Sequence, residues 1–285
     1  MRHSSVFFLT LLVLGCDGRP VFTPAAWVRV QAGSFMMGSP PSENCRESGQ
    51  FKETQHKVTL TRSFEISDSE TTQGQFEDEL GYNPSEFVEC GSDCPVEKVT
   101  WNEAVQYCNA LSKAKKLIEC YTCQGTDCDV AATFEGSKIY TCPGFRLPTE
   151  AEWEYATRAG TTSAFYNGLI ISCEGFDSSA SAIGWFFANS GMTIQTVKQK
   201  TPNAWKLYDM SGSVWEWVHD WFEPDLGATP VVDPAGPAVP TIGRALRGGS
   251  CQVKPQFLRS ASRWNYQPPG TRLKLHGFRC VRTVK

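Results

Sequence analysis

The chain has no surplus of positive charge and few histidines. Its 27 Lys and Arg residues are outnumbered by 30 Asp and Glu residues, which gives a formal net charge of −3, and it has 4 histidines. Proteins that bind nucleic acid usually present a basic surface to the phosphates, so this balance argues against that class. The histidines at 56, 219 and 276 show no metal-ligand spacing. We therefore expect neither nucleic-acid binding nor a histidine metal centre.

The N-terminus lacks an apolar run long enough to span a membrane. The run at residues 6–14 has fewer than half of the about 20 residues that a spanning helix needs. It follows two basic residues and ends at Gly15, the layout of a secretory signal peptide. The residues Val13-Leu14-Gly15-Cys16 resemble a bacterial lipobox, in which the cysteine becomes the first mature residue and carries lipid. An ordinary signal peptide cut nearby and a buried helix remain the alternatives.

This pattern predicts an export signal, an anchor and a tether before the folded body. We expect a lipoprotein-type signal peptide over 1–15, a lipid on Cys16 and a tether over 16–25. The protein would then lie in the bacterial cell envelope, held to a membrane only by the lipid. The rest, residues 26–285, is expected to form one domain, because 41% hydrophobic and 20% charged residues suit a packed core.

Local patterns in the body predict an α+β fold with much irregular chain. Strand-like pieces occur at 27–30, 33–38 and 57–61, the last alternating polar and apolar residues. Two capping boxes, in which side chains bond the free amides of a first turn, predict helices over 101–113 and from Thr149 to about Arg158. The proline-rich stretch 222–243 is expected to be a long surface loop.

Cysteine is abundant, with 12 residues, and in an exported protein disulfides are the default for it. Cys90 and Cys94 are close enough in sequence to close a small ring. A second group falls in a stretch rich in Thr, Gly and Asp, where we expect disulfides to staple a loop. A Cys₄ zinc site and a redox Cys-x-x-Cys motif are the alternatives. This group comprises Cys120, Cys123, Cys128 and Cys142. A lipid on Cys16 leaves an odd number of cysteines, so at least one thiol is free or paired between molecules.

Several blocks, in this order, resemble the formylglycine-generating enzyme domain, also called the sulfatase-modifying factor domain. The most specific is Arg146-Leu147-Pro148-Thr149-Glu150-Ala151-Glu152-Trp153-Glu154-Tyr155-Ala156. The resemblance covers nearly all of the mature chain and implies a variant of the C-type lectin fold. Residues 115–143 then stand as a cysteine-rich insertion before the central block. The other blocks are Gly33-Ser34-Phe35-Met36-Met37-Gly38, Val99-Thr100-Trp101, Leu207-Tyr208-Asp209-Met210-Ser211-Gly212-Ser213-Val214-Trp215-Glu216-Trp217, Arg247-Gly248-Gly249-Ser250 and Gly277-Phe278-Arg279.

The chain departs from the family at its copper site. The best-known members oxidise a protein cysteine to formylglycine with oxygen and a copper ion held by two cysteine thiolates. The matching positions here are Val253 and Leu258, which cannot bind copper, so copper is not expected. The resemblance therefore implies a catalytically altered binding or scaffold module. The alternative is an oxidoreductase that modifies a protein cysteine with an altered site, using Ser250 and Cys251 as the candidate catalytic residues.

Cys251 has two interpretations. A disulfide, with Cys45 or Cys173 as possible partners, is the expected one. Activation as a lone thiol would need a cation nearby, for which Lys254 and Arg247 are the sequence neighbours.

The resemblance also implies ligands and partners. A structural calcium ion would be held by Asp209 and Glu216 side chains and by the carbonyls of Gly212 and Val214, oxygen ligands that suit calcium. Cys108 and Cys280 fall where family members carry a disulfide. An extended peptide or protein segment is the expected partner, bound in a groove with Ser250 near its floor.

Overall fold

The computed structural model describes residues 24–47, 49–263 and 265–284. The predicted signal peptide over 1–15, the predicted lipidation site Cys16 and most of the predicted tether lie outside the described residues. Over these residues, thirteen strands and four α-helices, separated by long irregular segments, form a mixed α+β architecture, which confirms the predicted class. No helix in the described ranges has the length and apolar character needed to cross a membrane.

The helices begin at hydrogen-bonded caps that can be read in the sequence. Both predicted capping boxes form: Thr100 with Glu103 opens α2, and Thr149 with Glu152 opens α3. A third box, Thr72 with Gln75, opens a helix that the sequence reading missed. The helices are α1 (Gln73–Leu80), α2 (Trp101–Ala114), α3 (Glu150–Arg158) and α4 (Ser178–Ile183), and the 3₁₀ turns are η1 (Val88–Cys90), η2 (Ala132–Phe134), η3 (Gly136–Thr141) and η4 (Pro255–Leu258).

The strands form four small sheets rather than one large one. Their orders are β1-β4-β13-β7, β11-β10-β8-β12, β2-β3-β9 and β5-β6. The strands are β1 (Trp27–Val30), β2 (Gly33–Met37), β3 (His56–Leu60), β4 (Ser63–Ser67), β5 (Tyr121–Gln124), β6 (Asp127–Val130), β7 (Phe145–Arg146), β8 (Trp215–Trp221), β9 (Val231–Val232), β10 (Arg244–Arg247), β11 (Asn265–Gln267), β12 (His276–Phe278) and β13 (Val281–Val284).

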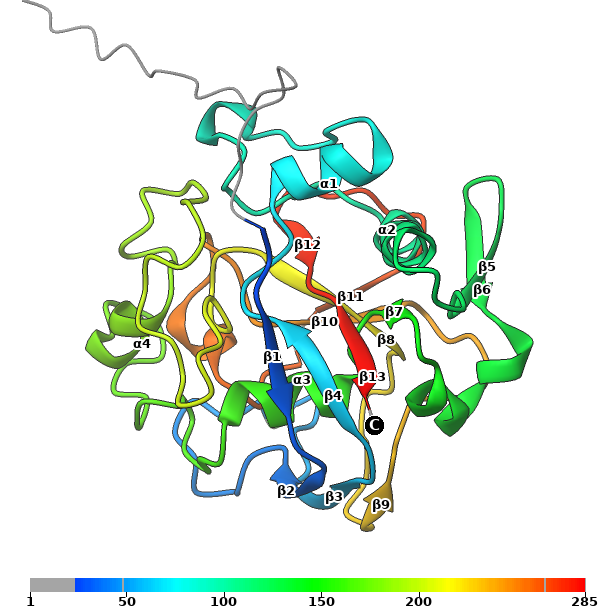
Figure 1. Cartoon of the computed structure of the whole chain (residues 1–285). Helices are drawn as coiled ribbons and strands as arrows, with labels where there is room; N and C mark the ends of the chain where they lie inside the picture. The colour runs from blue at the N-terminus through cyan, green and yellow to red at the C-terminus, as the bar shows by residue number, and fades with distance from the viewer. Residues whose placement is uncertain (1–23, 48, 264, 285) are drawn as a thin grey trace, which may run out of the picture.

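The first and last parts of the described chain meet in one sheet. Strand β4 pairs antiparallel with β1 on one side and with β13 on the other, as Figure 1 shows for the blue, cyan and red arrows. Strand β8 is buried over six of its seven residues and pairs antiparallel with β10 and parallel with β12. Helix α3 contacts β2, β8 and β10, so its side chains reach the centre of the molecule.

The cysteine-rich insertion is part of the main core. Figure 1 shows the β5–β6 hairpin at the edge of the molecule beside α2, and both strands contact that helix. Yet Tyr121, Phe134, Ile139 and Tyr140 are all buried and belong to the same hydrophobic cluster as Trp101. The insertion therefore contributes apolar surface to the domain, and it is not an independent appendage.

Candidate functional site

The central sequence block builds a network of buried ion pairs. Arg146 donates to both carboxylate oxygens of Glu152 at 2.6 and 2.7 Å, and both side chains are at most 1% exposed. On the same helix, Glu150 accepts from Arg263 and Arg247, at 2.5 and 3.1 Å in the closest contacts. Glu154 accepts from Arg247 at 2.7 Å and from Arg158 at 2.8 Å. The charged residues of this block therefore hold α3 against β7, β10 and the segment after η4.

The Gly-Gly-Ser segment, residues 248–250, makes a tight turn and packs against Phe257 and Leu258, which follow it in the chain. Gly249 has φ +80°, and a Cβ there would lie 2.9 Å from the carbonyl oxygen of Phe257, so this turn needs glycine. The next residue, Ser250, is 1% exposed. The amide of Cys251 donates to the carbonyl of Ser213 at 2.8 Å, which joins this segment to the predicted calcium segment. Ser250 is thus buried beneath the surface and is not open to a peptide.

Three buried carboxylates gather around Arg279. Glu216 receives two hydrogen bonds of 2.7 Å from Arg279 and one of 2.8 Å from the indole of Trp153. Burial, the dominant cause, raises the pKa of Asp209 to about 6. Burial and the charges of Asp209 and Glu216 raise the pKa of Glu70 well above its usual value. A weak interaction with the Ser213 side chain lowers that pKa, and the Glu70 carboxylate has no other hydrogen-bond partner among the described residues. Arg279 faces three buried acids, and the charge of Lys198 also acts on Asp209, so the acids still outnumber the cations around them.

This cluster matches the predicted calcium segment and adds a residue that the sequence reading missed. Asp209, Gly212, Val214 and Glu216 are all buried, and Asp209 and Glu216 act on each other electrostatically. Glu70 comes from the turn before α1, far away in sequence, so no local spacing pointed to it. The described residues contain no group of three or more His, Cys, Asp or Glu placed to hold a metal ion. The predicted calcium set, with two side chains and two carbonyls, does not require such a group.

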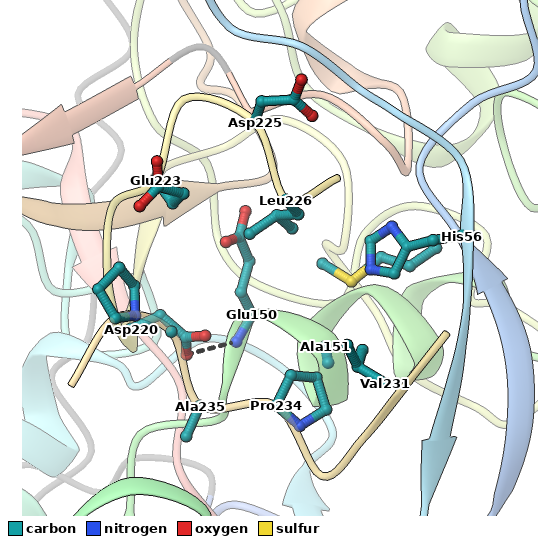
Figure 2. A pocket seen from close by; sticks show the side chains of 13 residues that line it. His56, Glu150, Ala151, Asp220, Glu223, Asp225, Leu226, Val231, Pro234 and Ala235 are labelled. Carbon is teal, nitrogen blue, oxygen red and sulfur yellow. Dashed lines mark hydrogen bonds between the residues drawn. The ribbon is translucent and has the colours of Figure 1, made fainter. Parts of the chain in front are cut away.

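A separate cavity of about 310 Å³ opens between the start of α3, β3 and the loop after β8. Figure 2 shows His56 on one side of it and Asp220 and Glu223 on the other. Asp220 accepts a hydrogen bond of 2.8 Å from the backbone amide of Glu150, the first residue of α3. Residues from 223 to 237 complete the wall. The proline-rich stretch, expected to be a surface loop, therefore encloses a cavity.

A wider surface pocket, of about 510 Å³, lies over the other end of α3. Three half-buried aromatic side chains line it, with the rings of Phe35 and Trp205 each 5.1 Å from that of Tyr155. Lys57 and Thr161 add polar groups at its edge. This pocket offers aromatic surface to a partner.

Sequence comparison assigns the family. The family model described as a sulfatase-modifying factor enzyme 1-like domain matches residues 16–284. The chain belongs to this family. The fold therefore is that of formylglycine-generating enzymes, as the sequence motifs predicted.

Relatives in the sulfatase-modifying factor family carry different names. Chaperone protein LppX of Paenibacillus barcinonensis is 34% identical over 206 residues, 61% of this chain and 70% of that protein. The formylglycine-generating enzyme of Streptomyces coelicolor is 37% identical over 150 residues, 48% of this chain and 46% of the enzyme, so the match spans less than half of each. The solved structure of Treponema denticola variable protein 1 superimposes with a TM-score of 0.74 at 29% identity, over 90% of this chain and 95% of that one.

The positions of the family's copper thiolates are apolar and packed. Leu258, at the end of η4, is fully buried in a cluster with Phe165, Ile183 and Phe186. Val253 is partly buried against the same cluster. The residues present therefore do not fit a copper ion.

Cys251 is a buried thiol, so the expected disulfide from it is wrong. Cys45 and Cys173 bond to each other instead, and Cys251 packs against Ile194, Val214 and Leu275. Burial is the main cause that raises its pKa to about 12. The two cations near it in sequence are engaged elsewhere, Lys254 with Glu174 and Arg247 with α3. The charge of Lys274 lowers the pKa of this thiol, but burial outweighs it, so the described surroundings leave Cys251 protonated at neutral pH.

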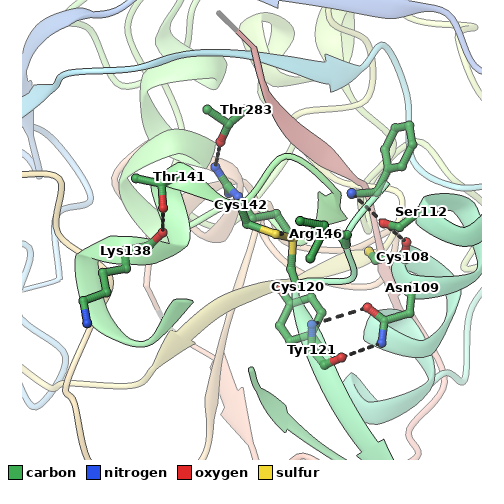
Figure 3. The surroundings of a disulfide bond; sticks show 12 residues. Cys108, Asn109, Ser112, Cys120, Tyr121, Lys138, Thr141, Cys142, Arg146 and Thr283 are labelled. Atoms are coloured by element: carbon green, nitrogen blue, oxygen red, sulfur yellow. Dashed lines mark hydrogen bonds between the residues drawn. A yellow bond between two sulfur atoms is a disulfide. The ribbon is translucent and has the colours of Figure 1, made fainter. Parts of the chain in front are cut away.

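The remaining cysteines follow the predictions with one exception. Cys90–Cys94 forms the small ring, and Cys120–Cys142 and Cys123–Cys128 staple the insertion, so the disulfide interpretation of that group is confirmed. Figure 3 shows Cys120–Cys142 beside Tyr121, whose backbone exchanges two hydrogen bonds with the side chain of Asn109.

The exception is the pair implied by the family resemblance. Cys108 and Cys280 are buried thiols with their sulfur atoms 3.2 Å apart, so this disulfide is not formed in the structure. A bonded pair would stand at about 2.0 Å. The resemblance was right that helix α2 and the start of β13 meet here, and wrong about the bond.

Proposed function

We propose that the protein is an exported, lipid-anchored binding or scaffold module whose sulfatase-modifying factor domain has lost the copper chemistry of its enzymatic relatives. One observation carries this proposal: Val253 and Leu258 replace the two metal thiolates with apolar side chains that pack into the protein. Copper(I) is held by soft thiolates, and an apolar pair offers it no ligand. The nearby Cys251 offers one buried thiol with a raised pKa, which is a poor nucleophile at neutral pH.

Two features of the chain, its disulfides and its N-terminal cysteine motif, support the proposed anchor and location. Four disulfides in the described part of the chain are typical of a protein that folds outside a reducing cytosol. The lipobox-like Val13-Leu14-Gly15-Cys16 supplies the expected site of the lipid. The resulting location is the bacterial cell envelope.

For the partner we propose an extended segment of another protein. The relative LppX is named as a chaperone, which supports a role in protein binding. Because Ser250 is buried, we place the contact away from it, at the pocket lined by Phe35, Tyr155 and Trp205. In other domains, grooves lined by aromatic side chains bind extended, proline-containing peptides.

We further propose that calcium stabilises the fold at Asp209 and Glu216. The group of three buried acids Glu70, Asp209 and Glu216 fits a divalent cation, which would lower the cost of ionising them. Of the roughly four lone-pair positions on the Glu216 carboxylate, Arg279 and Trp153 use three, so one remains for a metal. The carbonyls of Gly212 and Val214 would complete the oxygen ligands.

A peptide-oxidation assay tests the proposed loss of chemistry. The purified protein is incubated with copper(I), oxygen and a Cys-x-Pro-x-Arg peptide, and the peptide mass is followed. We expect no conversion, with an authentic formylglycine-generating enzyme as the positive control. Conversion that disappears in Cys251→Ser would establish the alternative, an oxidoreductase with an altered site.

A further inference from the structure

The cavity of Figure 2 is lined by four acidic residues and one histidine, with no lysine or arginine. Its walls carry Glu150, Asp220, Glu223 and Asp225, and they include no Lys or Arg. Two of these acids are neutralised from outside the cavity. Glu150 pairs with Arg263 and Arg247 behind α3, and Asp225 pairs with Lys52 at 3.2 Å. Asp220 and Glu223 form no direct ion pair with a described residue, although the charges of Arg244 and Arg263 reach Asp220 from outside the cavity.

Asp220 is the more unusual of the two. It is 4% exposed, and its single hydrogen bond, from the amide of Glu150 to Oδ2, leaves Oδ1 without a partner among the described residues. Burial, with the charge of Glu150 second, raises its pKa well above the usual value. A buried carboxylate at a cavity wall is costly unless a positive charge meets it. The charge of Arg244 does not offset this cost, so a cationic ligand in the cavity would reduce it further.

His56 supplies a further hydrogen-bond acceptor on the side of the cavity opposite Asp220 and Glu223. Its Nδ1 lies 3.0 Å from the carbonyl oxygen of Thr54, which can only accept, so in the neutral ring Nδ1 carries the proton. Nε2 then holds a lone pair and accepts a hydrogen bond. The side chain is 3% exposed, and it lines the cavity. Acceptors therefore stand on two sides of one space.

The remaining walls are apolar. They suit a hydrocarbon stem rather than a hydrated ion. They comprise Met37, Ala151, Leu226, Val231, Pro234 and Pro237. A bare metal ion is a poor match, because no three His, Cys, Asp or Glu side chains of the described residues are grouped to hold one.

We propose that this cavity binds an ammonium or guanidinium group carried on a short aliphatic chain, with Asp220, Glu223 and His56 as acceptors. That chemistry is shared by free alkyl amines and by the lysine and arginine side chains of a protein. The site is separate from the Gly-Gly-Ser segment and from the aromatic pocket, so it does not depend on the function proposed above.

Calorimetric titration of the full chain with three probes of equal length tests the charge requirement. The probes are pentylamine, 1-pentanol and pentanoate. We expect saturable binding of pentylamine, at least about tenfold weaker binding of the neutral alcohol, and none of the anion. A peptide with one central lysine and blocked ends, compared with its acetyl-lysine form, shows whether the source can be a protein side chain.

Two matched variants assign the binding to this cavity. Glu223→Gln removes a charge that holds no other group in place, and it should weaken pentylamine at least about fivefold. Glu135→Gln removes an exposed acid in the insertion and should leave the affinity unchanged. The proposal is overturned if pentylamine shows no saturable binding, if the alcohol binds equally well, or if Glu223→Gln behaves like Glu135→Gln.

Discussion

Arg279 donates hydrogen bonds of 2.7 Å to both carboxylate oxygens of Glu216, and both side chains are at most 1% exposed. This pair joins the end of β12 to the predicted calcium segment in β8. Its burial decides how the protein should respond when one partner is removed. A second pair, Arg282 with Glu65, has similar distances but lies partly in solvent, and serves as the comparison.

Glu216→Gln should destabilise the fold by about 3–5 kcal/mol, because it removes the only carboxylate among the described residues that forms a direct ion pair with the buried Arg279. The matched Glu65→Gln should cost about 1 kcal/mol or less, since solvent screens that pair. Urea unfolding in the presence of a chelator measures both without a contribution from bound metal. Equal losses in the two variants would contradict the importance of burial.

Calcium should raise the melting temperature of the protein, and a chelator should lower it. A ligand that binds only the folded state stabilises it by mass action. Asp209→Asn keeps an oxygen acceptor for the amide of Lys198 but removes a charge, so it should lose most of the calcium-dependent shift. Magnesium is the control cation. An unchanged melting temperature across all these conditions would argue against the calcium site.

Peptide mapping without reduction should recover four disulfides and leave Cys108, Cys251 and Cys280 as thiols. Removing Cys45–Cys173 by a double alanine substitution should cost about 3–5 kcal/mol, because this bond closes a long loop, with a sequence separation of 128. Removing Cys90–Cys94, with a separation of 4, should cost less. A Cys108–Cys280 bond in the map would restore the family pairing.

Cys251 should resist alkylation in the folded protein. With a pKa of about 12, it is almost wholly protonated at pH 7 to 9, and its burial excludes the reagent. Iodoacetamide should therefore label it only after unfolding, and raising the pH from 7 to 9 should have little effect. Rapid labelling at pH 7 would show an activated thiol and favour the enzymatic alternative.

Asp220→Asn should make the stability of the fold less sensitive to a rise in pH above about 4. A carboxyl whose pKa is raised in the folded state contributes its stability below the unfolded value of about 4, and loses it as the pH rises through the raised value. Asparagine can still accept from the amide of Glu150 but never ionises. The variant should therefore gain stability relative to the parent between pH 5 and pH 8. Denaturation of parent and variant is measured at each pH without added amine. If Asp220 ionises at low cost, the difference in stability between the two proteins will stay constant from pH 5 to pH 8.

The sequence was informative wherever a few neighbouring residues decide the outcome. Thr100 with Glu103 and Thr149 with Glu152 marked two helix starts, and the same signal, Thr72 with Gln75, was present but overlooked at α1. Each box needs only side chains three residues apart. The family motifs likewise predicted the fold class, because their order reflects the whole domain.

The site residues were harder to predict, because they come from separate segments. The cavity joins His56, Glu150, Asp220 and Glu223, and the buried acid Glu70 meets Asp209 only in the folded chain. Ser250 was placed near the floor of a groove by resemblance, yet it is 1% exposed. Burial depends on what packs above a residue, and its sequence neighbours do not report that.

The cysteines show most clearly which properties the sequence determines and which depend on the tertiary structure. By itself the sequence determined that this is a disulfide-rich α+β domain without the family's copper thiolates, because composition and the positions of Val253 and Leu258 require no contacts to read. Only the tertiary structure decided that Cys45 reaches Cys173, that Cys251 is left as a buried thiol and that an acidic cavity opens beside α3. The reason is physical: pairing and desolvation follow from which distant segments meet, and that is settled by the packing of the whole chain.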